Sequence, residues 1–338
     1  MKKLVSLALA CLLAVALAAC GSPAGNTPES APGSTPASST PLPESTPEST
    51  PDSSAATDLT TDRAGNPITP PAQVNGIVSM AASTTRTLYD LGLADKLVAI
   101  DTYSAANLPE DMAAELPQLD MMAPDLELLA SLAPDIIFVS PLSSAGGEDI
   151  YAPLRASGTC VAEVPSPDSI AGIFEDVQFI AALCGEAAAG TALVAGAQTQ
   201  LDEIAALVAT TQDRPGVYFE VSPAPNCYST GSGTYLNEMI ALAGGTNVFE
   251  DQESWIGVTE ESIVLAAPDV IFTVADYLED PVGEILARTG WETIPAVESG
   301  AVALISPADS QQPTTHVVDA VWAMLAVIHP ELSARQAA

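Results

Sequence analysis

Two glutamates occupy equivalent positions in two similar stretches of the sequence, and exposed carboxylates of this kind can pair with cations. Glu127 lies in "DLELLASLAPDIIFVS" and Glu261 in "TEESIVLAAPDVIFTV", and each precedes a Pro-Asp pair by seven residues. Asp125 and Thr259 are suitable helix N-caps, which places both glutamates in a first helical turn, where the helix dipole favours negative charge. A capping box would need its acid one residue later, so capping does not explain them. We therefore predict two exposed carboxylates at equivalent positions in the two similar parts of the chain.

A catalytic triad is a second chemistry that the residue types would allow. Ser232 stands between glycines in "TGSGTY", and His316 and Asp319 are three residues apart on an expected helix. The serine lacks the G-x-S-x-G spacing of a nucleophile elbow, and it would have to approach the histidine from a distant part of the fold. We therefore expect no catalytic residues and no enzyme, and a surface hydrolase is a less favoured alternative.

Side chains that could coordinate haem iron are present, whereas ligands for a bare metal ion are few. Tyr103, Met121, Met122 or His316 could serve as an axial ligand of haem. His316 and His329 are the only histidines, so a His-rich site for Zn²⁺ or Mn²⁺ is poorly supported. We expect no resident metal and no cofactor, and His316 would matter as an axial ligand only if the ligand is haem.

The elements that must position these residues alternate between strands and helices. In the first half "GIVSM" and "LVAIDTY" read as strands around the helical "TTRTLYDLGL", and "GVYFEVS" opens the same order in the second half. This alternation predicts an α/β fold with two similar lobes, each a mainly parallel sheet covered by helices. Between them, the Ala-rich, proline-free stretch from Ala187 to Gln212 predicts one long α-helix that joins the lobes.

The N-terminus reads as an export signal followed by a tether. "MKKLVSLALACLLAVALAAC" has two lysines, a short apolar run and small residues before Cys20, as in a lipoprotein signal. The next stretch is rich in Ser, Thr and Pro and buries too little apolar surface to fold. The expected organisation is a signal peptide (1–19), a disordered tether (20–58) that begins at the lipidated Cys20, an N-terminal α/β lobe (59–166), a helical segment with the interlobe helix (167–213) and a C-terminal α/β lobe (214–334).

Charge and cysteine content exclude several classes of function. Nine Lys and Arg residues against 43 Asp and Glu residues give a net charge of −34, which excludes nucleic acid as a partner and disfavours a strongly anionic ligand. Cys160, Cys184 and Cys227 are an odd number without a C-x-x-C pair, so a disulfide framework or zinc-thiolate site is not expected, although one pair could bridge.

The order of these parts resembles a known family. Four stretches carry the resemblance: "GIVSMAASTTRTLYDLGLADKLVAIDTYS", "DLELLASLAPDIIFVS", "YSTGSGTYLNEMIALAGGTNVFED" and "WIGVTEESIVLAAPDVIF". Over about residues 60–334 the chain is similar to the two-lobe, helical-backbone substrate-binding lipoproteins of ABC importers for vitamin B12, siderophores and haem. The resemblance implies that Glu127 and Glu261 dock on arginines of the permease subunits.

The resemblance also places the ligand between the lobes, at the loops that follow the strands. Met121 and Ser140 depart from the family, because some cobalamin binders have tryptophans there, and Arg86 replaces a common acid. Tyr103 and Tyr228 could instead pack in the core, whereas Trp255 follows a polar loop in which an exposed indole favours a ligand contact. The expected ligand-binding residues are Ser83, Thr84, Tyr103, Met121, Ser140, Tyr228, Trp255 and Asp309.

These observations predict the extracytoplasmic substrate-binding component of an ABC importer. It would be a monomer, anchored by lipid to the outer face of the cytoplasmic membrane, with permease and ATPase subunits as partners. The expected ligand is a small-molecule metal chelate, either a corrinoid such as cobalamin or a ferric siderophore. A haem-binding importer lipoprotein is the alternative, and an adhesion lipoprotein is less favoured.

Overall fold

The computed structural model describes residues 58–144 and 149–336, which belong to one compact unit, Ala55–Ala338. The expected signal peptide, Cys20 and the tether up to residue 57 lie outside the described residues. Within the described ranges, no helix combines the length and the apolar character that crossing a membrane requires. Below, residues 58–166 are called the N-terminal lobe and residues 214–336 the C-terminal lobe.

The N-terminal lobe contains a parallel sheet of five strands in the order β3-β2-β1-β4-β5. Its strands are β1 (Ile77–Ser79), β2 (Leu97–Asp101), β3 (Gln118–Leu119), β4 (Ile136–Val139) and β5 (Cys160–Glu163). Ile77 and Phe138 face one apolar core, and Val78 and Ile137 face another, because successive strand residues point to opposite faces. Both faces are therefore buried, as in most parallel sheets.

The helices around this sheet are short and connect successive strands. The α-helices of this lobe are α1 (Ala82–Asp90), α2 (Glu110–Glu115), α3 (Leu126–Leu132) and α4 (Ala152–Ala156), and the 3₁₀ turns are η1 (Ala94–Lys96), η2 (Ser104–Asn107) and η3 (Pro141–Ser144).

The C-terminal lobe repeats this plan with a parallel sheet in the order β11-β10-β6-β8 and adds a separate antiparallel pair of strands, β7 and β9. Its strands are β6 (Gly216–Glu220), β7 (Tyr228–Thr230), β8 (Thr246–Asn247), β9 (Trp255–Gly257), β10 (Val270–Thr273) and β11 (Val302–Leu304). Its helices are α7 (Tyr235–Leu242), α8 (Glu260–Ala266), α9 (Pro281–Leu286), α10 (Pro295–Ser299), α11 (Pro307–Ser310), α12 (Val317–Ile328) and α13 (Pro330–Gln336).

The two similar stretches of sequence begin their helices with side-chain caps. The Asp125 carboxylate accepts from the backbone N–H of Leu128 at 3.0 Å, and the Thr259 hydroxyl accepts from that of Ser262 at 3.2 Å. The Ser262 hydroxyl in turn accepts from the Thr259 N–H, which closes a capping box with a serine in place of an acid. Both predicted N-caps are confirmed.

The Pro-Asp pair explains how each of these stretches ends. Ala133 and Ala267 end their helices with positive φ angles of 44° and 46°, just before the proline. The aspartate that follows the proline then binds the start of a neighbouring strand. The Asp135 carboxylate accepts from the Gly76 N–H at 3.1 Å, and its counterpart Asp269 accepts from the N–H of Gly216 at the start of β6. The repeated phrase therefore encodes the same helix, stop and strand anchor in each lobe.

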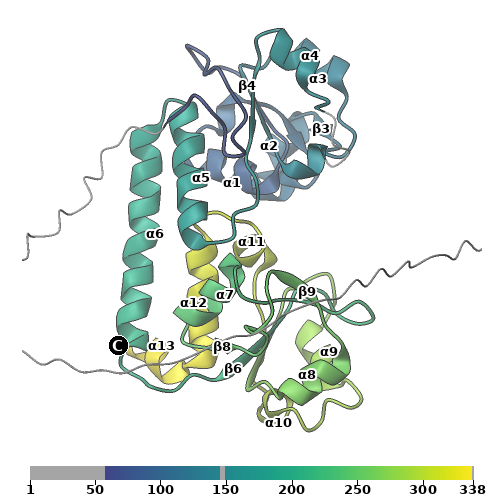
Figure 1. The fold of residues 1–338 in the computed structure, drawn as a ribbon, viewed down its shortest axis with the longest axis vertical. Coiled ribbons are helices and arrows are strands. Elements are labelled where there is room, and N and C mark those ends of the chain that lie inside the picture. The colour runs from purple at the N-terminus through teal and green to yellow at the C-terminus, as the bar shows by residue number, and fades with distance from the viewer. Residues whose placement is uncertain (1–57, 145–148, 337–338) are drawn as a thin grey trace, which may run out of the picture. The chain divides into compact units, whose positions relative to one another are not determined.

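Two antiparallel helices, α5 (Ile170–Leu183) and α6 (Ala187–Val208), connect the lobes and lie side by side (Figure 1). The 22 residues of α6 span roughly 33 Å. On α5, Ile173 packs in the core of the C-terminal lobe and Ile180 in that of the N-terminal lobe. The α/β fold with two parallel sheets and a long joining helix is confirmed, but the long helix is one member of a pair.

Candidate ligand site

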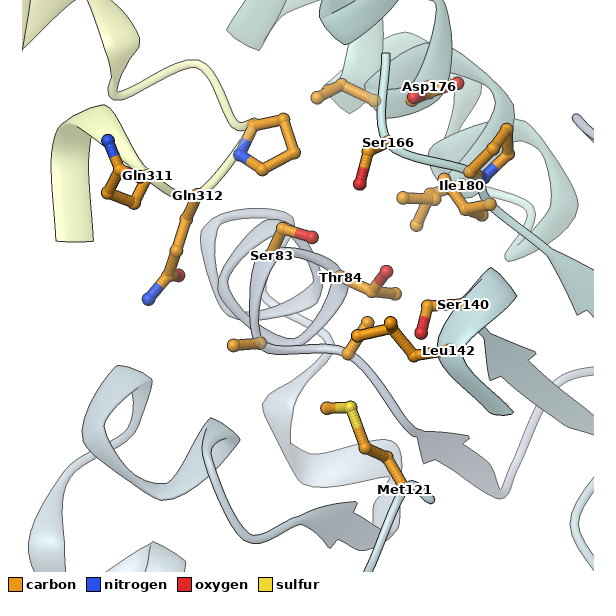
Figure 2. Close-up of a pocket in the computed structure, with 16 residues that line it drawn as sticks. Ser83, Thr84, Met121, Ser140, Leu142, Ser166, Asp176, Ile180, Gln311 and Gln312 are labelled. Atoms are coloured by element: carbon orange, nitrogen blue, oxygen red, sulfur yellow. The ribbon is translucent and has the colours of Figure 1, made fainter. Parts of the chain in front are cut away.

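A cavity of about 190 Å³ lies where β1, β3, β4 and β5 end, opposite a turn of the C-terminal lobe between α11 and α12 (Figure 2). This is the edge at which parallel α/β sheets usually bind ligands. The volume is below the 300–1,000 Å³ typical of small-molecule pockets. The cavity is lined by Ala81, Ala82, Ser83, Thr84, Met121, Ser140, Leu142, Val164, Pro165, Ser166, Asp176, Val177, Ile180, Gln311, Gln312 and Pro313.

Four of the eight predicted ligand-binding residues line this cavity. Ser83 and Thr84 lie in the first turn of α1, directly after β1, and Met121 and Ser140 follow β3 and β4 (Figure 2). Each is placed there by the end of a buried strand, so their convergence follows from the parallel order of the sheet.

The cavity lining contains three buried polar atoms that have no hydrogen-bond partner within the described residues. They are the hydroxyl oxygen of Ser140, Nε2 of Gln311 and Oε1 of Gln312. A buried polar atom without a partner costs about 1–3 kcal/mol. Because two of the three side chains are amides, the lining can offer both donors and acceptors to a ligand.

Asp176 is the one charged residue among those that line the cavity. Burial raises its pKa to about 6, and the hydrogen bond from Arg63 Nε, at 2.5 Å, opposes this rise. Arg63 also pairs with Glu175 at 2.8 Å, so its charge is already matched by two carboxylates. The described lining therefore offers no free cation to an anionic ligand.

The other four predicted ligand-binding residues lie outside this cavity. Tyr103 is 71% exposed on the turn after β2, where its N–H donates to Asp101 at 2.8 Å. Tyr228 lies on β7, and the Trp255 ring packs against Tyr235 with the ring centroids 5.9 Å apart.

The carboxylate of Asp309, the last of these four residues, accepts from Arg86 Nη2 at 3.0 Å. This ion pair joins α11 to α1, so the acid and the arginine noted in the sequence neutralise each other.

His316 is also absent from the cavity lining, and both of its ring nitrogens are engaged. Nε2 lies 3.0 Å from Asp90 Oδ2 and Nδ1 lies 3.0 Å from Asp319 Oδ2. These hydrogen bonds, chiefly that of Asp90, raise the pKa of His316. Potential ligand atoms of Asp309, His316 and Asp319 lie within 4.8 Å of one another, so these side chains have the types and spacing that a metal ion would require.

The two glutamates of the repeated phrase are exposed in the first turns of α3 and α8. No hydrogen bond or ion pair of the Glu127 or Glu261 carboxylate is present within the part of the chain that the structure describes.

Cys160, Cys184 and Cys227 are buried and unpaired, and burial raises the pKa of Cys160 to about 11.

Sequence reasoning did not single out Gln311, Gln312 or Asp176. The two glutamines stand in the turn between α11 and α12, and "QQP" is a polar pair followed by a proline in the segment that connects β11 to α12. This position was a usable signal. Asp176 gave none, because an acid within an apolar helical pattern reads as a surface residue.

Comparisons with known proteins agree with this architecture. The periplasmic binding protein family matches residues 77–308. The uncharacterized ABC transporter substrate-binding lipoprotein YvrC of Bacillus subtilis is 28% identical over 279 residues, which cover 81% of this chain and 86% of that protein. The cobalamin-binding protein of Halobacterium salinarum is 24% identical, over 79% of this chain and 73% of its own length. The solved structure of the periplasmic haem-binding protein RhuT from Roseiflexus sp. RS-1 shares the fold, with a TM-score of 0.66, 21% identity and coverage of 77% of this chain and 99% of that chain.

Proposed function

This chain belongs to the periplasmic binding protein family, and from that premise we propose that it is the substrate-binding component of an ABC importer. It binds its ligand outside the cytoplasm and delivers it to permease and ATPase subunits without doing chemistry on it. The relative from Bacillus subtilis, which is named as a substrate-binding lipoprotein and is similar over most of both chains, supports this role.

The observation that carries the ligand assignment is the uncharged, hydrogen-bonding lining of the cavity. Ser140, Gln311 and Gln312 each hold a buried polar atom without a partner, and no Lys, Arg or His is among the described residues that line the cavity. A corrinoid fits such a lining, because its rim carries neutral amides that both donate and accept hydrogen bonds. The cobalamin-binding relative supports the same class.

Anionic chelates fit this lining less well. Haem carboxylates and catecholate siderophores would desolvate negative charge beside Asp176 without a cation to neutralise it. A neutral ferric hydroxamate avoids this penalty and is the second ligand class that the lining accepts.

The size of the cavity requires motion before a large chelate can enter. About 190 Å³ is too small for a corrinoid, so the cavity has to open, and a movement of the turn at Gln311–Pro313 away from α1 would open it. The ion pairs of Arg86 with Asp309 and of Asp90 with His316 cross the same gap and would have to open with it.

We also propose that Cys20 carries the lipid anchor and that Glu127 and Glu261 dock on arginines of the permease. The lipobox-like sequence and the name of the Bacillus relative support the anchor. The matching exposure of both glutamates supports the docking role. Mass spectrometry of the N-terminal peptide tests the anchor: a diacylglyceryl thioether on Cys20 is expected, and an unmodified thiol contradicts it.

The ligand assignment is tested by calorimetric titration of the purified protein with cyanocobalamin, cobinamide, a ferric hydroxamate, a ferric catecholate and haem. We expect a dissociation constant in the micromolar range or tighter for a corrinoid or the neutral hydroxamate, and at least tenfold weaker binding of the two anionic chelates. Tightest binding of haem or of the catecholate would contradict the assignment.

A further inference from the structure

The two docking helices, α3 and α8, differ at the position one helical turn after their glutamates. Leu265 lies four residues after Glu261, whereas Ser131 lies four residues after Glu127. Residues four apart share one face of a helix, so each of these side chains lies beside its glutamate. Leu265 is 87% exposed, more than any other large apolar side chain among the described residues.

Leu265 belongs to an open hollow of about 700 Å³ on the C-terminal lobe. This hollow is also lined by Val264, Thr289, Gly290, Glu260 and Glu261, and the buried Trp291 lies behind it. A single exposed leucine is common on protein surfaces, but an exposed leucine within a hollow lined by apolar groups and acids is a feature of interaction sites.

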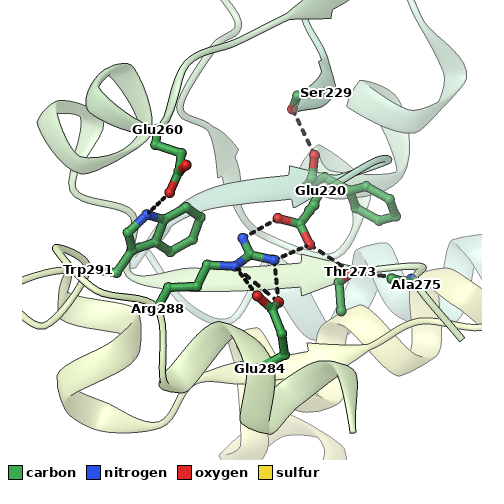
Figure 3. A network of polar contacts seen from close by, with 9 residues as sticks. Glu220, Ser229, Glu260, Thr273, Ala275, Glu284, Arg288 and Trp291 are labelled. Carbon is green, nitrogen blue, oxygen red and sulfur yellow. Dashed lines mark hydrogen bonds and ion pairs between the residues drawn. The ribbon is translucent and has the colours of Figure 1, made fainter. Parts of the chain in front are cut away.

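Trp291, which lies behind the hollow, is held by a partly buried polar network (Figure 3). Trp291 Nε1 donates to Glu260 Oε2 at 3.2 Å, and the Arg288 guanidinium lies 4.6 Å from the centre of the indole ring. Arg288 is fixed in turn by ion pairs with Glu220 and Glu284, at 2.5 and 2.6 Å. A preformed surface loses little entropy when a partner binds.

The charged groups beside the hollow indicate which kind of permease segment would bind there. Glu260 accepts a hydrogen bond from the neutral indole of Trp291, and within the described residues neither Glu260 nor Glu261 has an ion pair. Arg288, which lies over the indole, is already neutralised, so the charge beside the hollow is negative, and Glu261 is the acid without a hydrogen bond. A complementary segment therefore carries a cation that reaches Glu261 and, next to it, an apolar side chain that fits against Leu265.

We propose that the C-terminal lobe binds the permease through a two-part site, in which Glu261 pairs with a cationic side chain while the hollow around Leu265 receives an apolar side chain of the same permease segment. This inference rests on the proposed function and extends it, because the two lobes would dock unequally and the apolar contact would fix which lobe meets which part of the transporter.

The test measures the affinity of the ligand-free binding protein for its cognate permease–ATPase complex in nanodiscs by biolayer interferometry. Leu265→Ser gives α8 the residue found on α3, and we expect about tenfold weaker binding, since burial of a leucine is worth about that much or more. This loss should persist at high salt, whereas the loss caused by Glu261→Gln should shrink as ions screen the charge.

Controls separate this inference from the proposed function. Tyr277→Ser removes another strongly exposed apolar side chain of the same lobe, and Ser131→Leu adds a leucine to α3. Both variants should bind within about twofold of the wild type.

If Leu265→Ser binds like the wild type while Glu127→Arg/Glu261→Arg does not bind, the two-part site is wrong and the docking role stands. If the double variant also binds normally, the docking role itself fails. Wild-type dimers in sedimentation velocity that Leu265→Ser dissociates would instead assign the hollow to a second copy of the chain and overturn the inference.

Discussion

His316 Nε2 lies 3.0 Å from Asp90 Oδ2, which joins the start of α12 in the C-terminal lobe to the end of α1 in the N-terminal lobe. Asp319 faces the other ring nitrogen, and Arg86 and its partner Asp309 complete the charged groups around the imidazole. The lobes are therefore connected by side chains whose charge depends on pH, in addition to the helices α5 and α6.

This contact predicts a pH-dependent contribution to stability. Asp90 raises the pKa of His316 above its ordinary value of 6.5, so the folded state holds the proton more tightly than the unfolded chain does. The resulting stabilisation is fully present below the unfolded pKa and is lost as the pH rises through the higher folded pKa.

Urea unfolding of the wild type and His316→Gln at several pH values measures this contribution. The difference in unfolding free energy should be largest near pH 5.5 and smallest above about pH 8, on the acidic and basic sides of the ordinary histidine pKa. A difference that grows as the pH rises would contradict the assignment.

Substitution of the two glutamines in the cavity should affect ligand binding and stability in opposite ways. Gln311→Ala and Gln312→Ala each remove a buried polar atom that has no partner in the ligand-free protein, so the unfolding free energy should stay equal or rise. Each hydrogen bond to the ligand that is lost should weaken binding about fivefold to tenfold. Gln200→Ala, on the exposed face of α6, is the matched control. Unchanged ligand affinity in both cavity variants would remove these side chains from the site.

The pairing of α5 with α6 depends on a close approach at Gly190. A Cβ atom at Gly190 would lie 2.4 Å from the Cβ of Ala181, whereas a Cβ at Gly196 on the same helix would meet nothing within 4 Å. Gly190→Ala should therefore lower the unfolding free energy by about 1–3 kcal/mol through overpacking. Gly196→Ala should raise it by roughly 0.5–1 kcal/mol. Equal effects of the two substitutions on denaturation midpoints would show that the helices do not meet there.

The buried ion pair of Glu220 with Arg288 should contribute more to stability than its exposed neighbour (Figure 3). Burial alone would lower the pKa of Arg288, but its hydrogen bonds to Glu220 and Glu284 raise it. Glu220 is 1% exposed, so Glu220→Ala leaves a buried cation poorly matched and should cost about 3 kcal/mol or more. Glu284→Ala removes a half-exposed partner and should cost under about 1 kcal/mol. Thermal unfolding that ranks the two variants in the reverse order would contradict this.

Local signals in the sequence predicted much of the fold. Asp125 and Thr259 cap the helices that they were expected to cap, and the Pro-Asp pairs end those helices and lead into buried strands. The pairing of α5 with α6 could not be predicted in this way, because the contact of Gly190 with Ala181 depends on how two helices pack and leaves no pattern in either helix alone.

The side of the cavity that the N-terminal lobe forms was predictable from the sheet topology alone. Ser83 and Ser140 follow strands of one parallel sheet, so topology brings them together. Gln311 reaches the cavity from the other lobe, and only the tertiary arrangement places it there. The role of Asp309 in ligand binding stays a prediction, but its partner could not be predicted, because Arg86 is 223 residues away and no local pattern indicates the contact.

The most direct test of the account is ATP hydrolysis by the cognate permease–ATPase complex in nanodiscs, with the binding protein added ligand-free or loaded with cyanocobalamin. Wild-type protein should stimulate hydrolysis. The Glu127→Arg/Glu261→Arg variant should not, although calorimetry should find its ligand affinity unchanged, because both side chains lie outside the cavity. Stimulation by the double variant equal to that of the wild type would contradict the role proposed for the two acids. Absence of any stimulation by the wild type would contradict the assignment of this chain to an importer.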